Sequence, residues 1–258
     1  MITPLLQLDA VTMQFGGLRC ISDFSFSIGD GELVGLIGPN GAGKTTVFNL
    51  ITGVYRPTAG KIAFAGKSVI GHRPYRITAR GIARTFQNIR LFSSLSVFEN
   101  VRAACNMHLR HGISHALLRG RGFAREESEI ESRIVELLGI FGLTAERDIS
   151  CRALPYGDQR RLEIVRALAT RPRLLLLDEP AAGMNPTEKI ELMKLIRFTQ
   201  EKFGLAVLLV EHDMKVVMGI CQRIAVLDYG KKIAEGTADE IRHDPKVVAA
   251  YLGKESDA

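Results

Sequence analysis

The chain has 258 residues, of which 34 are lysine or arginine and 28 are aspartate or glutamate, so its formal net charge is +6. Apolar residues make up 46% and charged residues 24%, a balance that is typical of a globular protein with a large core. This composition excludes a wholly disordered chain, a collagen and a coiled coil. The length predicts one large domain, or one domain that carries an insertion.

Nothing in the sequence resembles a membrane span or a secretion signal. Apolar runs such as 174–177 and 205–210 are far shorter than the roughly 18 residues that a spanning helix needs. The N-terminal segment MITPLLQLDA has no basic region followed by a long apolar stretch. The four cysteines form no Cys-x-x-Cys motif, which predicts free thiols in a reducing compartment and no structural zinc site. We therefore expect a protein that stays in the cytoplasm, or that binds a membrane from that side.

A glycine-rich segment supplies the strongest chemical signal. Residues 33–37 (LVGLI) are a short apolar run, followed by GPNGAGKT at 38–45 and then by a helical pattern, which matches G-x-x-x-x-G-K-[ST] between a strand and a helix. Backbone amides of such a loop point at phosphates, Lys44 contacts the β- and γ-phosphates, and the Thr45 hydroxyl can bind Mg²⁺. The alternative is a glycine-rich turn before an ordinary helix. The predicted triphosphate-binding residues are Gly38, Pro39, Asn40, Gly41, Ala42, Gly43, Lys44, Thr45 and Thr46.

Two further apolar runs end in charged residues. Residues 174–177 (LLLL) are typical of a parallel strand that is buried on both faces, and its carboxyl end delivers Asp178 and Glu179 to the ligand crevice. We expect Asp178 to hold Mg²⁺ and Glu179 to orient and polarise the attacking water, because phosphoryl transfer needs mainly positioning and charge neutralisation. A third strand, 206–210, leads to His212, which can donate a hydrogen bond to the γ-phosphate. The alternatives are a solvated acidic pair and a surface histidine.

A segment between these motifs completes a recognisable set. Residues 154–161 (LPYGDQRR) open a helical run about twenty residues before the acidic strand. Together the motifs resemble the ATP-binding subunits of ABC transporters over nearly the whole chain, and this segment lies where that family has its signature motif. The resemblance implies that two nucleotide domains face each other head to tail, each ATP lying between one phosphate loop and the other signature helix. It assigns the trans contact to Leu154, Pro155, Tyr156, Gly157 and Asp158; the alternative is a simple helix start.

The signature segment departs from the family pattern at three positions. The family usually has serine where this chain has Pro155, glycine in place of Tyr156, and glutamine in place of Asp158. Proline fits the first turn of a helix, but the hydroxyl that would touch the γ-phosphate is missing. Gly157 and the helix N-terminus remain to face the phosphate. Asp158 brings a negative charge near an anionic ligand, which is unfavourable unless a cation lies close by.

Two more site residues follow from the resemblance. Gln87, in RTFQNIRLF, matches the family's glutamine that contacts Mg²⁺ or water and adjoins the membrane partner. Phe15 lies where the family places an aromatic side chain that stacks on adenine. Because Val11, Met13 and Phe15 alternate along the sequence, Phe15 can instead continue the buried face of a strand.

The segments FQNIRLF, LPYGDQRRLEIVRALATRP and LLLLDEPAAGMNP are similar to the ATP-binding subunits of branched-chain amino acid importers. The resemblance implies an ATP hydrolase, bound peripherally at the cytoplasmic side of the inner (plasma) membrane, whose ATP-driven dimer closure moves permease subunits. Its implied partners are a second ATP-binding subunit (identical or different), integral-membrane permeases and, indirectly, a substrate-binding protein, with no nucleic acid. The alternatives are a subunit for another cargo, including an exporter, a soluble ABC ATPase without a permease, and a small-molecule kinase.

The resemblance also implies an α/β fold: a P-loop (RecA-like) ABC ATPase core with an antiparallel β addition and an inserted α-helical subdomain. Residues 1–87 and 153–235 are assigned to the core, about 88–152 to the helical subdomain, and 236–258 to C-terminal helices. Between 102 and 125 the chain has five arginines, three histidines and no acidic residue. We expect a solvated face there; the alternative is a surface near anionic lipid headgroups.

Further local signals predict how the elements begin and end. Asp228, Tyr229, Gly230 and Lys231 separate two apolar stretches and predict a hairpin. The helix that follows the acidic strand should have Asn185 as its N-cap, Pro186 as its first residue and Glu188 as its third. Thr237 and Glu240 predict a capping box, and Asp244-Pro245 predicts the start of a last helix.

Overall fold

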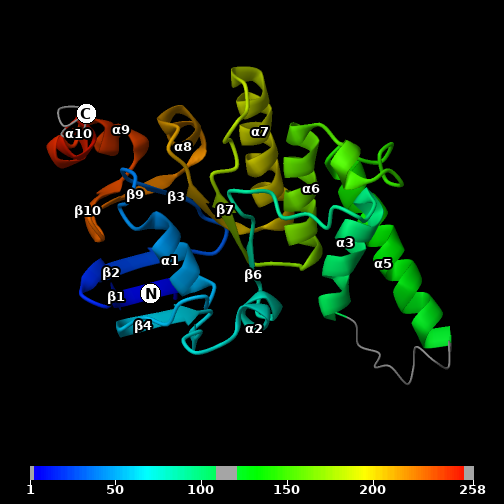
Figure 1. The fold of residues 1–258 in the computed structure, drawn as a ribbon, viewed down its shortest axis with the longest axis horizontal. Coiled ribbons are helices and arrows are strands. Elements are labelled where there is room, and N and C mark those ends of the chain that lie inside the picture. Colours follow the sequence, from blue (N-terminus) through cyan, green and yellow to red (C-terminus); the bar gives the residue numbers. More distant parts are fainter. Residues whose placement is uncertain (1–2, 109–120, 253–258) are drawn as a thin grey trace. The chain divides into compact units, whose positions relative to one another are not determined.

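The computed structural model describes residues 3–108 and 121–252. Its contacts divide the chain into two compact units, one of Met1–Arg84 with Arg173–Ala258 and the other of Thr85–Pro172, and each is described by itself (Figure 1). The centre of the basic segment 102–125 lies outside the described residues. In the part of the chain that is described, none of the helices has the length and apolar content needed to span a bilayer.

The first unit is built on a six-stranded sheet with the order β10-β9-β3-β8-β7-β6. Its strands are β3 (Leu33–Ile37), β6 (Ile82–Arg84), β7 (Leu174–Asp178), β8 (Ala206–Val210), β9 (Arg223–Asp228) and β10 (Lys231–Gly236). All neighbours pair in parallel except β9 and β10, which form the predicted antiparallel hairpin. Every residue of β3, β7 and β8 is buried, as expected for continuous apolar strands inside a parallel sheet. The carboxyl ends of these strands therefore share one edge.

A second, antiparallel sheet has the order β2-β1-β4-β5. Its strands are β1 (Leu6–Phe15), β2 (Leu18–Ile28), β4 (Ala59–Phe64) and β5 (Lys67–Ser68). The buried side chains of this sheet, among them Phe24 and Phe26, belong to one hydrophobic cluster with Val47 and Phe48 of helix α1 (Lys44–Ile51). The predicted antiparallel addition to the P-loop core is confirmed.

The other helices of the first unit are α2 (Pro74–Ala79), α7 (Pro186–Phe203), α8 (Met214–Ile220), α9 (Ala238–His243) and α10 (Pro245–Leu252). The predicted helix starts are confirmed. Asn185 and Glu188 form a capping box at α7, with Pro186 as the first helical residue. Thr237 and Glu240 form another capping box at α9. These starts were readable because a cap involves residues only three apart in sequence.

The second unit is helical. It contains α3 (Val97–Cys105), α5 (Arg121–Ile140) and α6 (Tyr156–Ala169), with short 3-10 turns at Asn106–His108 and Cys151–Ala153. The described part of this unit has no named strand, only an isolated bridge between Ser96 and Ser150. Helix α6 packs against both α3 and α5, so the unit extends to Pro172 rather than to residue 152 and includes the signature segment.

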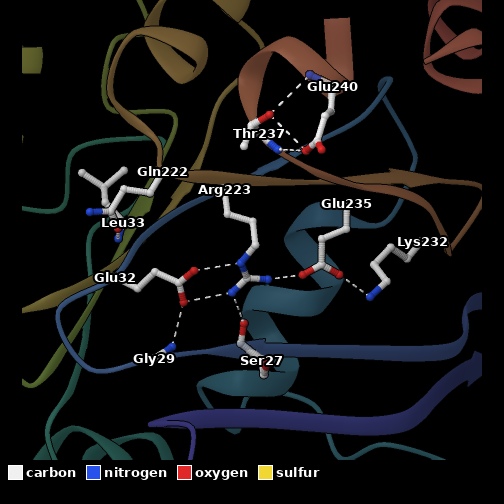
Figure 2. Close-up of polar contacts among 10 residues, drawn as sticks. All are labelled: Ser27, Gly29, Glu32, Leu33, Gln222, Arg223, Lys232, Glu235, Thr237 and Glu240. Atoms are coloured by element: carbon white, nitrogen blue, oxygen red, sulfur yellow. Dashed lines mark hydrogen bonds and ion pairs between the residues drawn. The ribbon is translucent and has the colours of Figure 1, made fainter. Parts of the chain in front are cut away.

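One polar network ties the first unit's two sheets together (Figure 2). Arg223, at the start of β9, donates hydrogen bonds to Glu32 (Nε–Oε1 2.8 Å, Nη2–Oε2 2.9 Å) and to the carbonyl of Ser27 at 2.7 Å. It also pairs with Glu235 of β10, which in turn pairs with Lys232. The network lies where β3 and β9 begin. It therefore stabilises the edge of the sheet that holds the amino ends of these strands, opposite to the edge that holds their carboxyl ends.

The charge of Glu32 depends on this network. Burial alone would raise its pKa, but the hydrogen bonds from Arg223 and from the amide of Gly29, with the positive charge of Arg223, outweigh burial and lower it below 4.5. A carboxyl whose pKa is lower in the folded than in the unfolded chain stabilises the fold above the unfolded pKa. That contribution is lost as the pH falls through the folded pKa.

We predict that Arg223→Met lowers the free energy of unfolding at pH 7 by about 1–2 kcal/mol, the range for a charged hydrogen bond at a partly exposed site. The difference in unfolding free energy between variant and wild type should shrink as the pH falls below the pKa of an ordinary glutamate. Wild type then loses the stability that the ionised Glu32 contributes. Urea unfolding at pH 7 and pH 4 measures both. Arg173→Met is the matched control, since the Arg173–Asp30 pair is exposed on both sides. Equal losses in the two variants would contradict the prediction.

Candidate nucleotide site

The phosphate loop leaves β3 in a shape that only glycine allows. Gly38 has φ +152°, and a Cβ there would lie 2.0 Å from the carbonyl oxygen of Leu227. Gly43 has φ +108°, and its Cβ would meet Ile21 Cδ1 at 2.7 Å. Both positions combine a left-handed backbone with a close approach of neighbouring atoms. Leu227 of β9 and Ile21 of β2 therefore leave no room for a side chain at Gly38 and Gly43.

The start of α1 is prepared for an anion. Gly43 is its N-cap in a left-handed conformation, no side chain caps the helix, and the first turn contains no acidic residue. Lys44 is only 7% exposed, and its ammonium donates hydrogen bonds to the carbonyls of Gly38 (2.7 Å) and Pro39 (3.0 Å). Helix N-terminal amides and a fixed ammonium are the groups from which proteins build phosphate-binding sites. The exposed Thr45 follows Lys44 directly.

The end of β7 carries a buried ion pair that the sequence analysis missed. Asp178 is 5% exposed, and its Oδ2 lies 2.7 Å from Nη2 of Arg84, at the end of β6. Arg84 also donates to Asn49 Oδ1 at 2.7 Å and lies over the ring of Phe48. The sequence feature that could have revealed this pair is the position of Arg84 at the end of a short strand. Charged residues at the carboxyl ends of parallel strands face the same crevice.

The structure brings two predicted residues, Glu179 and His212, together. The distance between Glu179 Oε2 and His212 Nδ1 is 3.5 Å. Glu179 has φ +46°, a left-handed conformation that is uncommon for a residue with a Cβ, and its amide is fixed by a 2.8 Å hydrogen bond to the carbonyl of Val210. Backbone strain of this kind costs about 1–3 kcal/mol and clusters at functional sites. Here it aims the glutamate side chain toward the histidine.

The oxygen atoms of Asp178 and Thr45 can hold a magnesium ion whose other ligands come from substrate phosphates and water. Among the described residues no group of three or more His, Cys, Asp or Glu side chains could bind a metal by itself. Mg²⁺, however, is usually held by one or two protein oxygens together with substrate phosphates and water. Asp178 and Thr45 are oxygen donors of that kind, located at the end of β7 and in the first turn of α1.

Phe15 does not continue the buried face of β1. Val11 is fully buried and Met13 is 7% exposed, whereas Phe15 is 42% exposed. Its ring meets the ring of Tyr55 edge to face, with centroids 5.0 Å apart and an angle of 77°. Phe15 is therefore an exposed aromatic side chain that a second ring holds in place.

In the second unit, Pro155 is the N-cap of α6 and the helix begins at Tyr156, one residue later than a first-turn proline would place it. Leu154 is buried, and a Cβ on Gly157 would meet nothing within 4 Å. Asp158 has a neighbouring cation, because Nη1 of Arg161 lies 3.5 Å from its Oδ1.

A buried ion pair joins the signature helix to the chain around Gln87. Arg160 and Glu163 are 1% and 2% exposed in their side chains and lie 2.9 Å apart. Arg160 donates to the carbonyls of Phe86 and Gln87, and Glu163 Oε1 accepts from the amide of Phe86 at 3.1 Å. The sequence analysis missed both residues. The sequence feature that could have revealed them is an arginine and a glutamate three residues apart, on a helix that has two apolar faces.

A family model described as ABC transporter matches residues 21–182, which include the phosphate loop, Gln87, the signature segment and the acidic strand. The chain belongs to the ABC transporter ATP-binding family. It is accordingly an ATP-binding subunit of the ABC type that hydrolyses ATP. A second model, described as branched-chain amino acid ATP-binding cassette transporter, matches residues 231–257.

Relatives match nearly the whole length of the chain. The "High-affinity branched-chain amino acid transport ATP-binding protein LivG" of Salmonella typhimurium is 45% identical over 98% of this chain and 100% of its own. The correspondingly named BraF of Pseudomonas aeruginosa is 43% identical over the same shares. The "Lipopolysaccharide export system ATP-binding protein LptB" of Escherichia coli is 34% identical over 93% of this chain and 94% of its own.

Solved structures agree with the fold. The ADP conformation of MJ1267, an ATP-binding cassette of an ABC transporter, superposes with a TM-score of 0.84 at 28% identity, covering 97% of this chain and 99% of that one. The chain cbiO1 from Clostridium perfringens, part of an ABC transporter complex, gives 0.81 at 27% identity, with 97% and 95% covered. The predicted P-loop ABC ATPase fold is confirmed.

We predict that Arg160→Met lowers the free energy of unfolding by about 3–5 kcal/mol, because it leaves Glu163 buried without its counter-charge. Guanidinium unfolding followed by circular dichroism measures the loss. Arg125→Met is the matched control: it also removes an arginine from an Arg–Glu pair on a helix, but that pair is exposed and should contribute under about 1 kcal/mol. A loss for Arg160→Met no larger than the control's would refute the prediction.

Proposed function

We propose that this chain is the ATP-hydrolysing subunit of an importer for branched-chain amino acids, acting peripherally at the cytoplasmic side of the inner membrane. The observation that carries the proposal is the 43–45% identity to LivG and BraF over 98% of the chain, whose names state branched-chain amino acid transport. The second family model, over residues 231–257, supports the same cargo. The lower identity to LptB, an export subunit, makes export of another cargo the second candidate.

In this proposal the first unit binds and cleaves ATP. The loop amides and Lys44 bind the phosphates, while Thr45 and Asp178 hold Mg²⁺, which when bound neutralises charge on the transferred phosphoryl group. Glu179 orients and polarises the attacking water, and His212 donates a hydrogen bond to the γ-phosphate. The exposed Phe15 ring, supported by Tyr55, stacks on adenine.

Arg84 extends this scheme. Its 2.7 Å contact supplies a counter-charge to a carboxylate that is almost completely buried. An unpaired buried carboxylate is costly, so Arg84 gives Asp178 a hydrogen-bonded counter-ion and orients its side chain before Mg²⁺ binds. Asn49 and the ring of Phe48 fix the guanidinium from the side of α1, the helix that begins with the phosphate loop's lysine.

The second unit contributes the trans contact and the link to the permease. A second ATP-binding subunit, identical or different, places its γ-phosphate at Pro155–Asp158, where the Arg161 cation offsets the charge of Asp158. Gln87 responds to the state of the nucleotide and adjoins the permease; Arg160 fixes its backbone to the same helix that carries the signature. A substrate-binding protein acts indirectly, through the permeases.

We predict that Glu179→Gln retains ATP binding but lowers the rate of phosphate release by at least about 100-fold, because a glutamine cannot polarise the water as a base does. Equilibrium binding of ATP and release of inorganic phosphate are measured on the same preparations. Lys44→Ala is the contrasting variant and should lose binding as well as turnover. A normal rate of hydrolysis in Glu179→Gln would show that Glu179 is not the base.

We also predict which proteins accompany the chain in the cell. Gentle affinity purification of the tagged chain from native membranes should recover two polytopic permeases and a second ATP-binding subunit. Uptake of labelled leucine, isoleucine and valine should then fall when the wild-type chain is replaced by Glu179→Gln. Recovery from the soluble fraction alone, or with ribosomes or nucleic acid, would leave the ATPase in place but exclude the importer.

A further inference from the structure

Glu211 is a buried acid to which the scheme above gives no task. It directly follows the buried strand β8 and precedes His212, and it is 0% exposed. Its two carboxylate oxygens have different partners. Oε1 accepts a 2.7 Å hydrogen bond from the amide of Ala181, and Oε2 accepts a 3.2 Å hydrogen bond from the amide of His212.

These two amides belong to the two segments that carry the proposed water-side residues. Ala181 lies two residues after Glu179, in the loop that leaves β7, and His212 begins the segment after β8. His212 Nδ1 is 3.5 Å from Glu179 Oε2 and 3.9 Å from Glu211 Oε2, so the imidazole faces both carboxylates. A single side chain thus fastens the loop after Glu179 to the backbone of the histidine.

The other side of His212 is fixed as well. Asp213 is the N-cap of α8, where its side chain accepts from the amide of Lys215 at 2.9 Å, and it pairs with Lys189 of α7 at 2.7 Å. His212 therefore lies between two acids that are each anchored to neighbouring elements. Its exposed ring can reach a ligand while its backbone stays in place.

Stability alone does not favour an acid at this position. Burial raises the pKa of Glu211, although hydrogen bonds from the amides of Ala181, His212 and Asp213 and the charge of His212 oppose it. A carboxyl whose pKa is higher in the folded chain destabilises the fold increasingly as the pH rises through that folded pKa. A buried ionisable group that lowers stability is expected to serve function instead, because active sites commonly trade stability for activity.

We propose that Glu211 is a positioning residue for ATP hydrolysis, which uses its two oxygens to hold the loop after Glu179 and the backbone of His212 in one fixed geometry. This inference rests on the proposed roles of Glu179 and His212. It adds a link between them that passes through backbone amides rather than through the nucleotide, so the spacing of base and histidine is set before ATP binds.

The test compares Glu211→Gln with Glu201→Gln, an exposed residue of α7 that loses the same charge. A glutamine has one acceptor oxygen and one NH₂ group, so one of the two amides must lose its acceptor. We expect Glu211→Gln to have a melting temperature equal to or above that of wild type at neutral pH. Its kcat should fall by about 10- to 100-fold, the effect of displacing a catalytic group by about an ångström. The KM for ATP should change less than about twofold, because the phosphate loop is untouched.

Glu211→Asp is the second variant, since it keeps the charge but is one methylene too short to reach both amides. It should show the same loss of kcat while remaining folded. A wild-type kcat in either variant overturns the proposal. A fall in melting temperature that accompanies the loss of kcat in both variants also overturns it, because Glu211 would then be purely structural. Absence of ATP hydrolysis in wild type would instead contradict the proposed function. In that case, slower hydrogen exchange of the Ala181 and His212 amides in wild type than in Glu211→Gln would still support the link that Glu211 makes between the two segments.

Discussion

The parallel pairing of β3 with β8, and of β8 with β7, is the constraint on which the site depends. All residues of these three strands are buried, and Asp178, the last residue of β7, is the one charged residue among them, so the polar side chains gather where the strands end. In a parallel sheet those ends lie at one edge. The phosphate loop, the Asp178–Glu179 pair and the Glu211–His212 pair, which are far apart in the sequence, therefore meet in one place without any element being built for that purpose.

Within each of the two units, buried charges keep polar segments in position. Arg84 pairs with Asp178, Glu211 accepts from two loop amides, and in the second unit Arg160 pairs with Glu163 while it binds the carbonyl of Gln87. An isolated charge in such surroundings would be costly, and each of these is compensated by an ion pair or by amide hydrogen bonds. Because the compensation requires defined geometry, these side chains restrict loops that apolar packing would leave free to shift.

The two compact units divide the chemistry proposed for the chain. The first carries the residues proposed to bind phosphates and activate water, and the second carries the signature segment and Gln87. Within the second unit, one helix presents both the signature at its N-terminus and, one turn later, the arginine that holds the backbone of Gln87. The proposed contact with a second subunit and the proposed contact with the permease thus share a single rigid element.

The sequence by itself determined the P-loop fold, the strand that ends in Asp178 and the helix starts at Asn185 and Thr237, because each depends on residues close together in the chain. Only the tertiary structure decided which distant side chains meet: Arg84 with Asp178, 94 residues away, or the Ala181 amide with Glu211, 30 residues away. The exposure of Phe15 and the reach of the second unit to Pro172 were decided in the same way. Strand order and helix packing fix such contacts, and neither leaves a pattern in the local sequence, since the same apolar runs are compatible with many neighbours.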